Sequence, residues 1–115
     1  MVYLIKKQNK YHAKSTEYNG VIYHSKKEAA YAQELDLRQK AGEIKKWERQ
    51  VKIPLKVYGQ HICNYYIDFV VYYPSGEVEY VEVKGFATQL WRLKWKLFEA
   101  IYNKEHPEIK LTIIR

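Results

Sequence analysis

The sequence predicts a small α/β domain in which a helix, three antiparallel strands, a second helix and a last strand follow an N-terminal hairpin. Two stretches with helical spacing are separated by three extended stretches, which end at turns containing glycine or proline. The chain has 115 residues, of which 47% are hydrophobic. A chain of this size and composition can bury the core of one domain, here residues 1–115.

The first elements are predicted by local turn and capping signals. Asn19-Gly20 lies between two short runs of strand-forming residues and predicts a hairpin with a type I′ turn. Ser25, followed three residues later by Glu28, predicts the start of a helix that runs to about Lys40. Gly42 supplies the left-handed residue with which helices often end.

The central stretches are predicted to form a meander of three strands. Residues 44–58 read as extended, and Pro54 indicates an edge strand or an irregularity there. A turn at Gly59-Gln60 leads into a second strand, and Pro74-Ser75-Gly76 leads into a third that ends near Lys84.

The second helix is predicted over 88–105, before a stop at His106-Pro107 and a last strand over 110–114. Its buried face is predicted by four residues at helical spacing, which are Leu90, Leu93, Leu97 and Ile101. Trp91 and Trp95 are interpreted as core or interface residues, with stacking on a base as the alternative.

The charge distribution favours a polyanionic partner. Twenty Lys and Arg residues face thirteen Asp and Glu residues, and residues 1–27 carry six lysines against one acid, Glu17. Such a basic segment favours nucleic acid through counterion release, although a basic protein without such a partner has the same composition. Residues 1–14 are interpreted as a basic arm. The candidate DNA contacts are Lys6, Lys7, Lys10, Lys14, Lys26 and, on the second helix, Lys94.

The cysteine and histidine residues and the length of the apolar runs exclude several kinds of site and segment. Cys63 is the only cysteine, which excludes an internal disulfide framework and a cysteine-based zinc site. The four histidines show no ligand spacing. The longest apolar run near the start, residues 2–5, is too short for a signal peptide or a membrane span. We therefore expect a cytoplasmic protein with no membrane partner.

Two acidic residues and a lysine are predicted to share one face of the sheet. If the loop holds Pro74-Ser75-Gly76, the register that follows places Asp68 directly opposite Glu82. Lys84 lies two residues further and therefore on the same face. A loop one residue longer or shorter would separate the two acids, so the inference depends on the register.

A divalent cation explains why two carboxylates converge there. Magnesium takes carboxylate oxygens as ligands, and its charge removes the repulsion between them. Water polarised by the ion can attack a phosphodiester, and Lys84 could orient that water or stabilise the phosphate. The alternative is a solvated surface ladder. Against it, Asp68 lies within an apolar run, residues 65–71, where a charge should be paired or bound to metal.

With Asp68 on one strand and Glu82-Val83-Lys84 on the next, the chain resembles the PD-(D/E)XK nuclease superfamily. It is more closely similar to a family of small phage proteins related to Holliday-junction resolvases. Five segments carry this resemblance, namely residues 10–14, 25–29, 41–44, 66–69 and 83–85. One departure is Ile67, which stands where the superfamily often has proline before the acidic residue.

The resemblance implies a restriction-endonuclease-like core and a metal-dependent DNA endonuclease. Its catalytic residues would be Glu28, Asp68, Glu82 and Lys84, with Mg²⁺ (or Mn²⁺ as a substitute) held by the three carboxylates. The implied substrate is branched DNA, not a small molecule, and the implied form is a homodimer in the host cytosol. The alternatives are a less selective nuclease or nickase, and a non-catalytic nucleic-acid-binding module on the same fold.

Glu28 has two interpretations. The resemblance gives it a metal-facing role on the first helix, whereas the Ser25–Glu28 spacing is that of a capping box. Glu28 shares a helical stripe with Leu35, so it can face the protein interior. Leu37 lies on the opposite side of the helix, so the sequence does not decide which face of the helix is buried.

Overall fold

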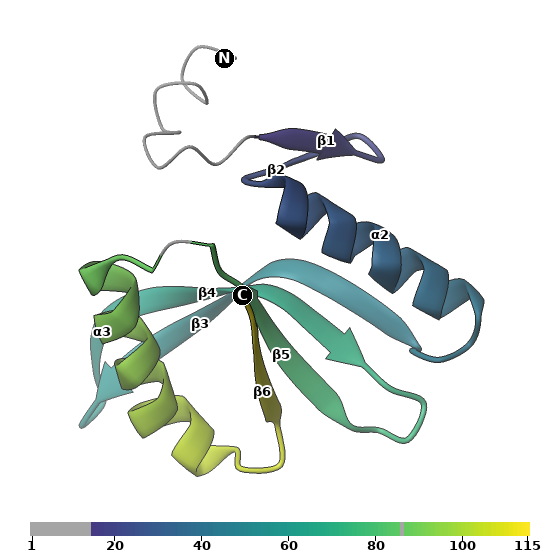
Figure 1. Ribbon diagram of the computed structural model, residues 1–115. Helices are drawn as coiled ribbons and strands as arrows, with labels where there is room; N and C mark the ends of the chain where they lie inside the picture. Colours follow the sequence, from purple (N-terminus) through teal and green to yellow (C-terminus); the bar gives the residue numbers. More distant parts are fainter. Residues whose placement is uncertain (1–14, 86) are drawn as a thin grey trace. The chain divides into compact units, whose positions relative to one another are not determined.

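The computed structural model describes residues 15–85 and 87–115 and divides the chain into two compact units, Met1–Glu43 and Ile44–Arg115. The described residues form a mixed α/β protein with two sheets and two helices (Figure 1). Neither helix within these residues combines the length and the hydrophobicity that a membrane span requires. The lysines of the predicted arm lie outside the described residues; these are Lys6, Lys7, Lys10 and Lys14.

The first unit contains a short hairpin and a helix. β1 (Thr16–Tyr18) and β2 (Val21–Tyr23) pair antiparallel across Asn19-Gly20, whose positive φ angles of 53° and 80° suit a type I′ turn. α2 (Lys26–Lys40) begins after Ser25 and ends before Gly42, which has a φ of 80°. The predicted turn and both predicted helix ends are therefore confirmed.

The second unit is built on a four-stranded sheet. Its strands are β3 (Lys46–Val57), β4 (Gln60–Tyr72), β5 (Val78–Val83) and β6 (Lys110–Ile114), in that spatial order. The first three are antiparallel neighbours, whereas β6 runs parallel to β5. The predicted order of elements is confirmed, and Pro54 lies in the edge strand β3, as proline requires.

The turn between β3 and β4 lies one residue earlier than predicted. Tyr58 and Gly59 occupy it with φ angles of 49° and 79°, and Gln60 already belongs to β4. A two-residue hairpin turn of this type requires positive φ at both central positions. The glycine was therefore a correct turn signal, but it stands at the second turn position instead of the first.

The register between β4 and β5 is the predicted one. The backbone N–H of Tyr73 donates to the carbonyl oxygen of Glu77 at 3.0 Å, so the loop holds the three expected residues. The pairs that follow are Tyr72–Val78, Val71–Glu79, Val70–Tyr80 and Phe69–Val81. Side chains on β4 and β5 therefore share faces as the sequence predicted.

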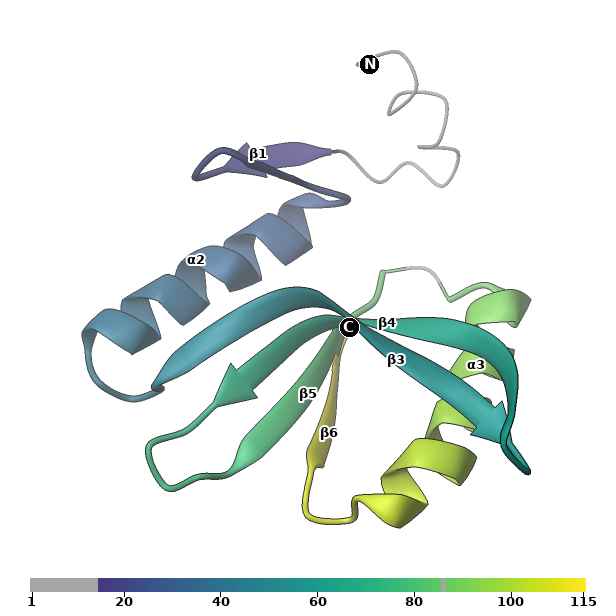
Figure 2. The ribbon, with the colours of Figure 1, turned by 180° about the vertical axis from the view of Figure 1, so that it is seen from behind.

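The sheet splits where β4 leaves β5. The ladder between these strands ends at Phe69 and Val81, yet β4 continues beside β3 back to Gln60, and β5 continues beside β6 to Val83. Figures 1 and 2 both show β4 running on with β3 toward α3, away from the end of β5. We call this opening the β4–β5 fork. Asp68 and Glu82 are the first residues beyond the last pair.

α3 (Gln89–Phe98) continues into a π-helical turn, η1 (Glu99–Asn103), and covers one face of the second unit's sheet (Figure 2). Trp95 and Phe98 are its buried residues. They belong to a core cluster whose buried members are Ile53, Leu55, Tyr65, Ile67, Val70, Tyr80, Trp95 and Phe98.

The predicted leucine stripe of α3 is partly wrong. Leu97 and Ile101 pack against the core, but the side chains of Leu90 and Leu93 are 62% and 58% exposed. The aromatic residues Trp95 and Phe98 face the sheet instead. An aromatic side chain removes more apolar surface from water than a leucine does, so the aromatics decide which face is buried.

Candidate active site

Asp68 and Glu82 meet across the β4–β5 fork. Asp68 Oδ2 accepts the backbone N–H of Val83 at 2.9 Å, and Glu82 Oε1 accepts the backbone N–H of Asp68 at 3.3 Å. The register is the predicted one, but these two residues are not a ladder pair, because their carboxylates bond to backbone groups of the facing strand. Each strand is therefore held by the acidic side chain of the other, which brings the two carboxylates together.

Glu82 is a buried carboxyl group beside a second one. Its side chain is only 2% exposed. Burial, followed by the negative charge of Asp68, raises the pKa of Glu82 to about 8, while the Lys84 ammonium acts in the opposite direction. Both carboxylates can be ionised together only at a cost, which a proton or a cation would remove.

Lys84 follows β5 directly. Its backbone N–H donates to the carbonyl oxygen of Ile114 at 2.8 Å, so β6 fixes the point at which the chain leaves the sheet. Lys84 Nζ lies 3.9 Å from Glu82 Oε2 and 5.0 Å from the centre of the Trp91 ring. The ammonium group thus has a buried carboxylate and an aromatic face as neighbours, and its side chain still reaches solvent.

Tyr65 and Trp91 form a wall beside these charges. Trp91 Nε1 donates to the Tyr65 hydroxyl oxygen at 2.9 Å, and Thr88 caps the helix start that carries Trp91. Burial and the Glu82 carboxylate raise the pKa of Tyr65, so its hydroxyl stays protonated and can donate to Glu82. The sequence placed Tyr65 in the apolar run 65–71, but it carried no signal that the Tyr65 hydroxyl would face a carboxylate.

Gln50 is a site residue that the sequence did not single out. Its Nε2 donates to Asp68 Oδ1 at 3.2 Å. Its φ is +50°, a left-handed conformation that is unfavourable for a residue with a side chain, and it interrupts the β3–β4 ladder between Arg49 and Val51. No glycine or turn residue marks this position, so local sequence carries no signal for it.

The carboxylate pair suits a hard divalent cation. Magnesium commonly takes one or two protein carboxylates and keeps its remaining ligands as water. Asp68 and Glu82 retain lone pairs beyond the hydrogen bonds described above, because each oxygen of a carboxylate can accept more than one donor. Within residues 15–85 and 87–115, no three His, Cys, Asp or Glu side chains gather at one place, so the fork offers a pair of acidic ligands.

Glu28 lies in the first unit, on the buried face of α2. Its backbone N–H donates to Ser25 Oγ at 3.1 Å, which confirms the first half of the predicted capping box. Its side chain is buried, as are those of Ala32 and Leu35, whereas Leu37 is exposed. The buried face of α2 is therefore the one that carries Glu28 and Leu35. Glu28 Oε1 lies 3.7 Å from His24 Nδ1. Its membership of a site with Asp68 and Glu82 stays a prediction.

The remaining predicted contacts lie on the two helices. Lys26 is exposed in the first turn of α2, and Lys94 is half-buried on α3. Their contact with DNA stays a prediction. Trp95 is a core residue, as interpreted from the sequence.

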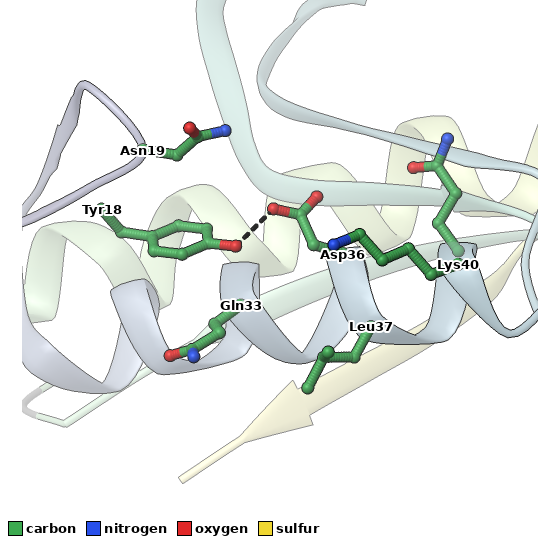
Figure 3. A pocket seen from close by; sticks show the side chains of 7 residues that line it. Tyr18, Asn19, Gln33, Asp36, Leu37 and Lys40 are labelled. Atoms are coloured by element: carbon green, nitrogen blue, oxygen red, sulfur yellow. Dashed lines mark hydrogen bonds between the residues drawn. The ribbon is translucent and has the colours of Figure 1, made fainter.

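A separate groove lies on the first unit, between the hairpin tip and α2 (Figure 3). Inside it, the Tyr18 hydroxyl donates to Asp36 Oδ2 at 2.5 Å, and this hydrogen bond raises the pKa of Tyr18. The groove is lined by Tyr18, Asn19, Gln33, Asp36, Leu37, Gln39 and Lys40. It contains none of the predicted catalytic residues, and the candidate site is therefore the β4–β5 fork.

Comparison with known proteins yields one family. A family model described as a protein of unknown function (DUF1064) matches residues 8–115, which is nearly the whole chain. A search of curated proteins found no match. The family description specifies no chemistry, so the functional argument depends on the residues of the fork.

Proposed function

The chain belongs to the DUF1064 family of proteins of unknown function, and we propose that it is a metal-dependent DNA endonuclease. The observation that carries the proposal is the meeting of Asp68 and Glu82 across the β4–β5 fork, with Lys84 beside Glu82. An acidic residue on one strand and an acid-x-Lys triplet on the next form the pattern by which the chain resembles PD-(D/E)XK nucleases. The proposal includes their restriction-endonuclease-like core.

Asp68 and Glu82 would hold Mg²⁺ through carboxylate oxygens, and Mn²⁺ could replace it. When bound, the ion would supply positive charge that acidifies water and neutralises the phosphate. Gln50 would hold Asp68 in position through the amide hydrogen bond, and Tyr65 would do the same for Glu82. The proposal includes Glu28 as a third carboxylate ligand of the ion.

Lys84 would act on the reacting groups. From its position near Glu82, its ammonium can donate to the attacking water or to a non-bridging phosphate oxygen. The water oxygen would form a bond to phosphorus as the bond from phosphorus to one sugar oxygen breaks. The water would lose a proton to solvent, and the departing sugar oxygen would take one up.

The proposed substrate is branched DNA, such as a four-way junction. The formal charge of +7 supports a nucleic-acid partner. Resolution of a junction needs two matched cuts, and one fork holds one carboxylate pair. A symmetric homodimer, in which each subunit supplies one fork, is therefore the proposed form.

The test is cleavage of four matched substrates, a four-way junction, a flap, a duplex and a single strand, each with Mg²⁺, with Mn²⁺ and with chelator. We expect cuts only in the presence of metal, and most readily at the junction. Equal cutting of duplex and junction would favour the less selective nuclease. Binding without cleavage under every condition would favour the non-catalytic module and contradict the proposal.

A further inference from the structure

The β3–β4 hairpin has two different faces beyond Gln50 and Asp68. On one face, Ile53, Leu55 and Tyr65 are buried in the core cluster that contains the aromatic residues of α3. The opposite face is exposed or half-buried along its length. We call it the outer hairpin face and define it by Lys52, Pro54, Lys56, Ile62, Asn64 and Tyr66.

The outer hairpin face is basic. Residues 50–67 include Lys52, Lys56 and His61 and contain no aspartate or glutamate. Lys52 and Lys56 both lie on this face, because alternate residues of a strand point the same way. A polyanion is therefore the partner that this face suits by charge.

Tyr66 adds an exposed aromatic ring to these charges. It is 50% exposed and pairs directly with Lys52 across the β3–β4 ladder. Directly paired residues have β-carbons about 5 Å apart, so the ring and the ammonium group can contact one ligand together. A nucleotide offers a base for the ring and a phosphate for the lysine, the combination found where proteins hold single-stranded nucleic acid.

The Tyr66–Lys52 pair lies next to the fork. Tyr66 precedes Asp68 by two residues on β4, and Lys52 follows Gln50 by two residues on β3. Two residues of a strand span about 7 Å. A DNA strand with a phosphate at the fork would therefore place a neighbouring nucleotide within reach of this pair.

We propose that the outer hairpin face binds the DNA strand that leaves the fork, with an unpaired base stacked on Tyr66 and a phosphate beside Lys52. The position of the cleaved phosphate rests on the proposed function, whereas binding to this face does not require cleavage. An unpaired base is available in a single strand, and the base pairs beside a branch point open more readily than those inside an intact duplex. The face would thus favour branched DNA over an uninterrupted duplex.

The test is DNA binding by the full chain carrying Glu82→Gln, measured by fluorescence anisotropy with a labelled four-way junction and a labelled duplex of the same sequence. Adding Tyr66→Ala should weaken junction binding by about fivefold or more, while Tyr66→Phe, which keeps the ring, should bind like the parent. Lys52→Ala should reduce the slope of log affinity against log salt by about 0.7 to 0.9. Lys104→Ala, an exposed lysine beyond η1, is the charge control and should change the slope less.

The outcomes separate this proposal from the nuclease proposal. If Tyr66→Ala and Lys52→Ala bind the junction like the parent while the wild-type chain cleaves it, the outer hairpin face is not the binding surface and the nuclease stands. If both variants bind the junction more weakly but the wild-type chain does not cleave it with Mg²⁺ or Mn²⁺, the binding surface is supported and the nuclease proposal is contradicted. Melting temperatures of all variants, measured alongside, show that the exposed substitutions leave the fold intact.

Discussion

Two buried glutamates lie three residues apart on β5 and have opposite surroundings. Glu79 accepts hydrogen bonds from the hydroxyl groups of Tyr73 and Thr112, each at 2.5 Å. Glu82 faces the carboxylate of Asp68 across the fork. Glu79 thus has two neutral donors as its partners, whereas Glu82, in addition to its own donors and Lys84, lies against a like charge.

This difference separates a structural acid from a candidate catalytic one. Glu79 and Glu82 are 6% and 1% exposed, so burial alone does not distinguish them. The hydroxyl partners of Glu79 join β5 to β6 and to the β4–β5 turn, which explains its burial through the fold. The arrangement around Glu82 is unfavourable for the fold by itself, and perturbed groups of this kind concentrate at functional sites.

The largest difference between Glu82 and Glu79 should appear when each is replaced by glutamine in turn. Glu82→Gln removes a charged ligand and keeps the side-chain volume, so cleavage should fall by at least about a hundredfold while DNA binding survives. Glu79→Gln makes the same chemical change three residues away and should leave cleavage near the wild-type rate. Single-turnover cleavage of a four-way junction measures both variants.

Stability should change in the opposite order. Glu79→Gln places a neutral amide against two hydroxyl groups in place of a strong acceptor, so it should lower the free energy of unfolding by about 1 kcal/mol. Glu82→Gln relieves the repulsion with Asp68 and should leave the metal-free protein as stable as the wild type or more so. Wild-type cleavage by Glu82→Gln would remove the fork from consideration as the active site.

The next prediction asks whether a third carboxylate belongs with Glu82. If Glu28 is a metal ligand, Glu28→Gln should reduce cleavage by about tenfold to a hundredfold with little loss of stability, because glutamine can also serve a capping box. Ser25→Ala is the control. It should cost about 1 kcal/mol of stability through loss of the N-cap and leave the chemistry intact. An active Glu28→Gln enzyme would make Glu28 a structural acid like Glu79.

Local signals predicted the parts of the fold that local geometry determines. Asn19-Gly20, Ser25 and Gly42 marked a turn and two helix ends because their own backbone and side-chain preferences decide those positions. The three-residue loop after Tyr73 predicted the register that brings Asp68 near Glu82. The acidic pair was therefore within reach of sequence reasoning.

Long-range packing determines what the sequence did not predict. The ladder stops at Phe69 because β4 stays with β3 while β5 stays with β6, and no residue near Asp68 marks that competition. The buried face of α3 depends on aromatic residues meeting the hairpin, so the leucine spacing misled at Leu90 and Leu93. The left-handed backbone of Gln50 likewise lacks a local cause.

Gln50 allows a test of backbone strain beside the candidate site. Gln50→Gly removes the amide that holds Asp68 and relieves an unfavourable backbone conformation. Cleavage should therefore fall by about tenfold, while the free energy of unfolding stays equal or rises by up to about 1 kcal/mol. Tyr58→Gly is a matched control, because Tyr58 has a similar φ of 49° at the hairpin tip. It should gain stability without loss of cleavage.

The last prediction is a pH dependence of stability to which Glu82 contributes. The folded-state pKa of Glu82 is raised from 4.5 to about 8, so between these values the folded protein holds a proton that the unfolded chain releases. Raising the pH through this window therefore lowers the stability of the metal-free protein, and the fall ends near pH 8.

Glu82→Gln should remove this part of the fall, whereas Glu79→Gln should keep it, as measured by melting temperature against pH in chelator. The difference between variant and wild type isolates the contribution of Glu82. Mg²⁺ should stabilise the wild type more as the pH rises, because the ion then no longer competes with the proton. Parallel pH profiles for wild type and Glu82→Gln would contradict the raised pKa of Glu82.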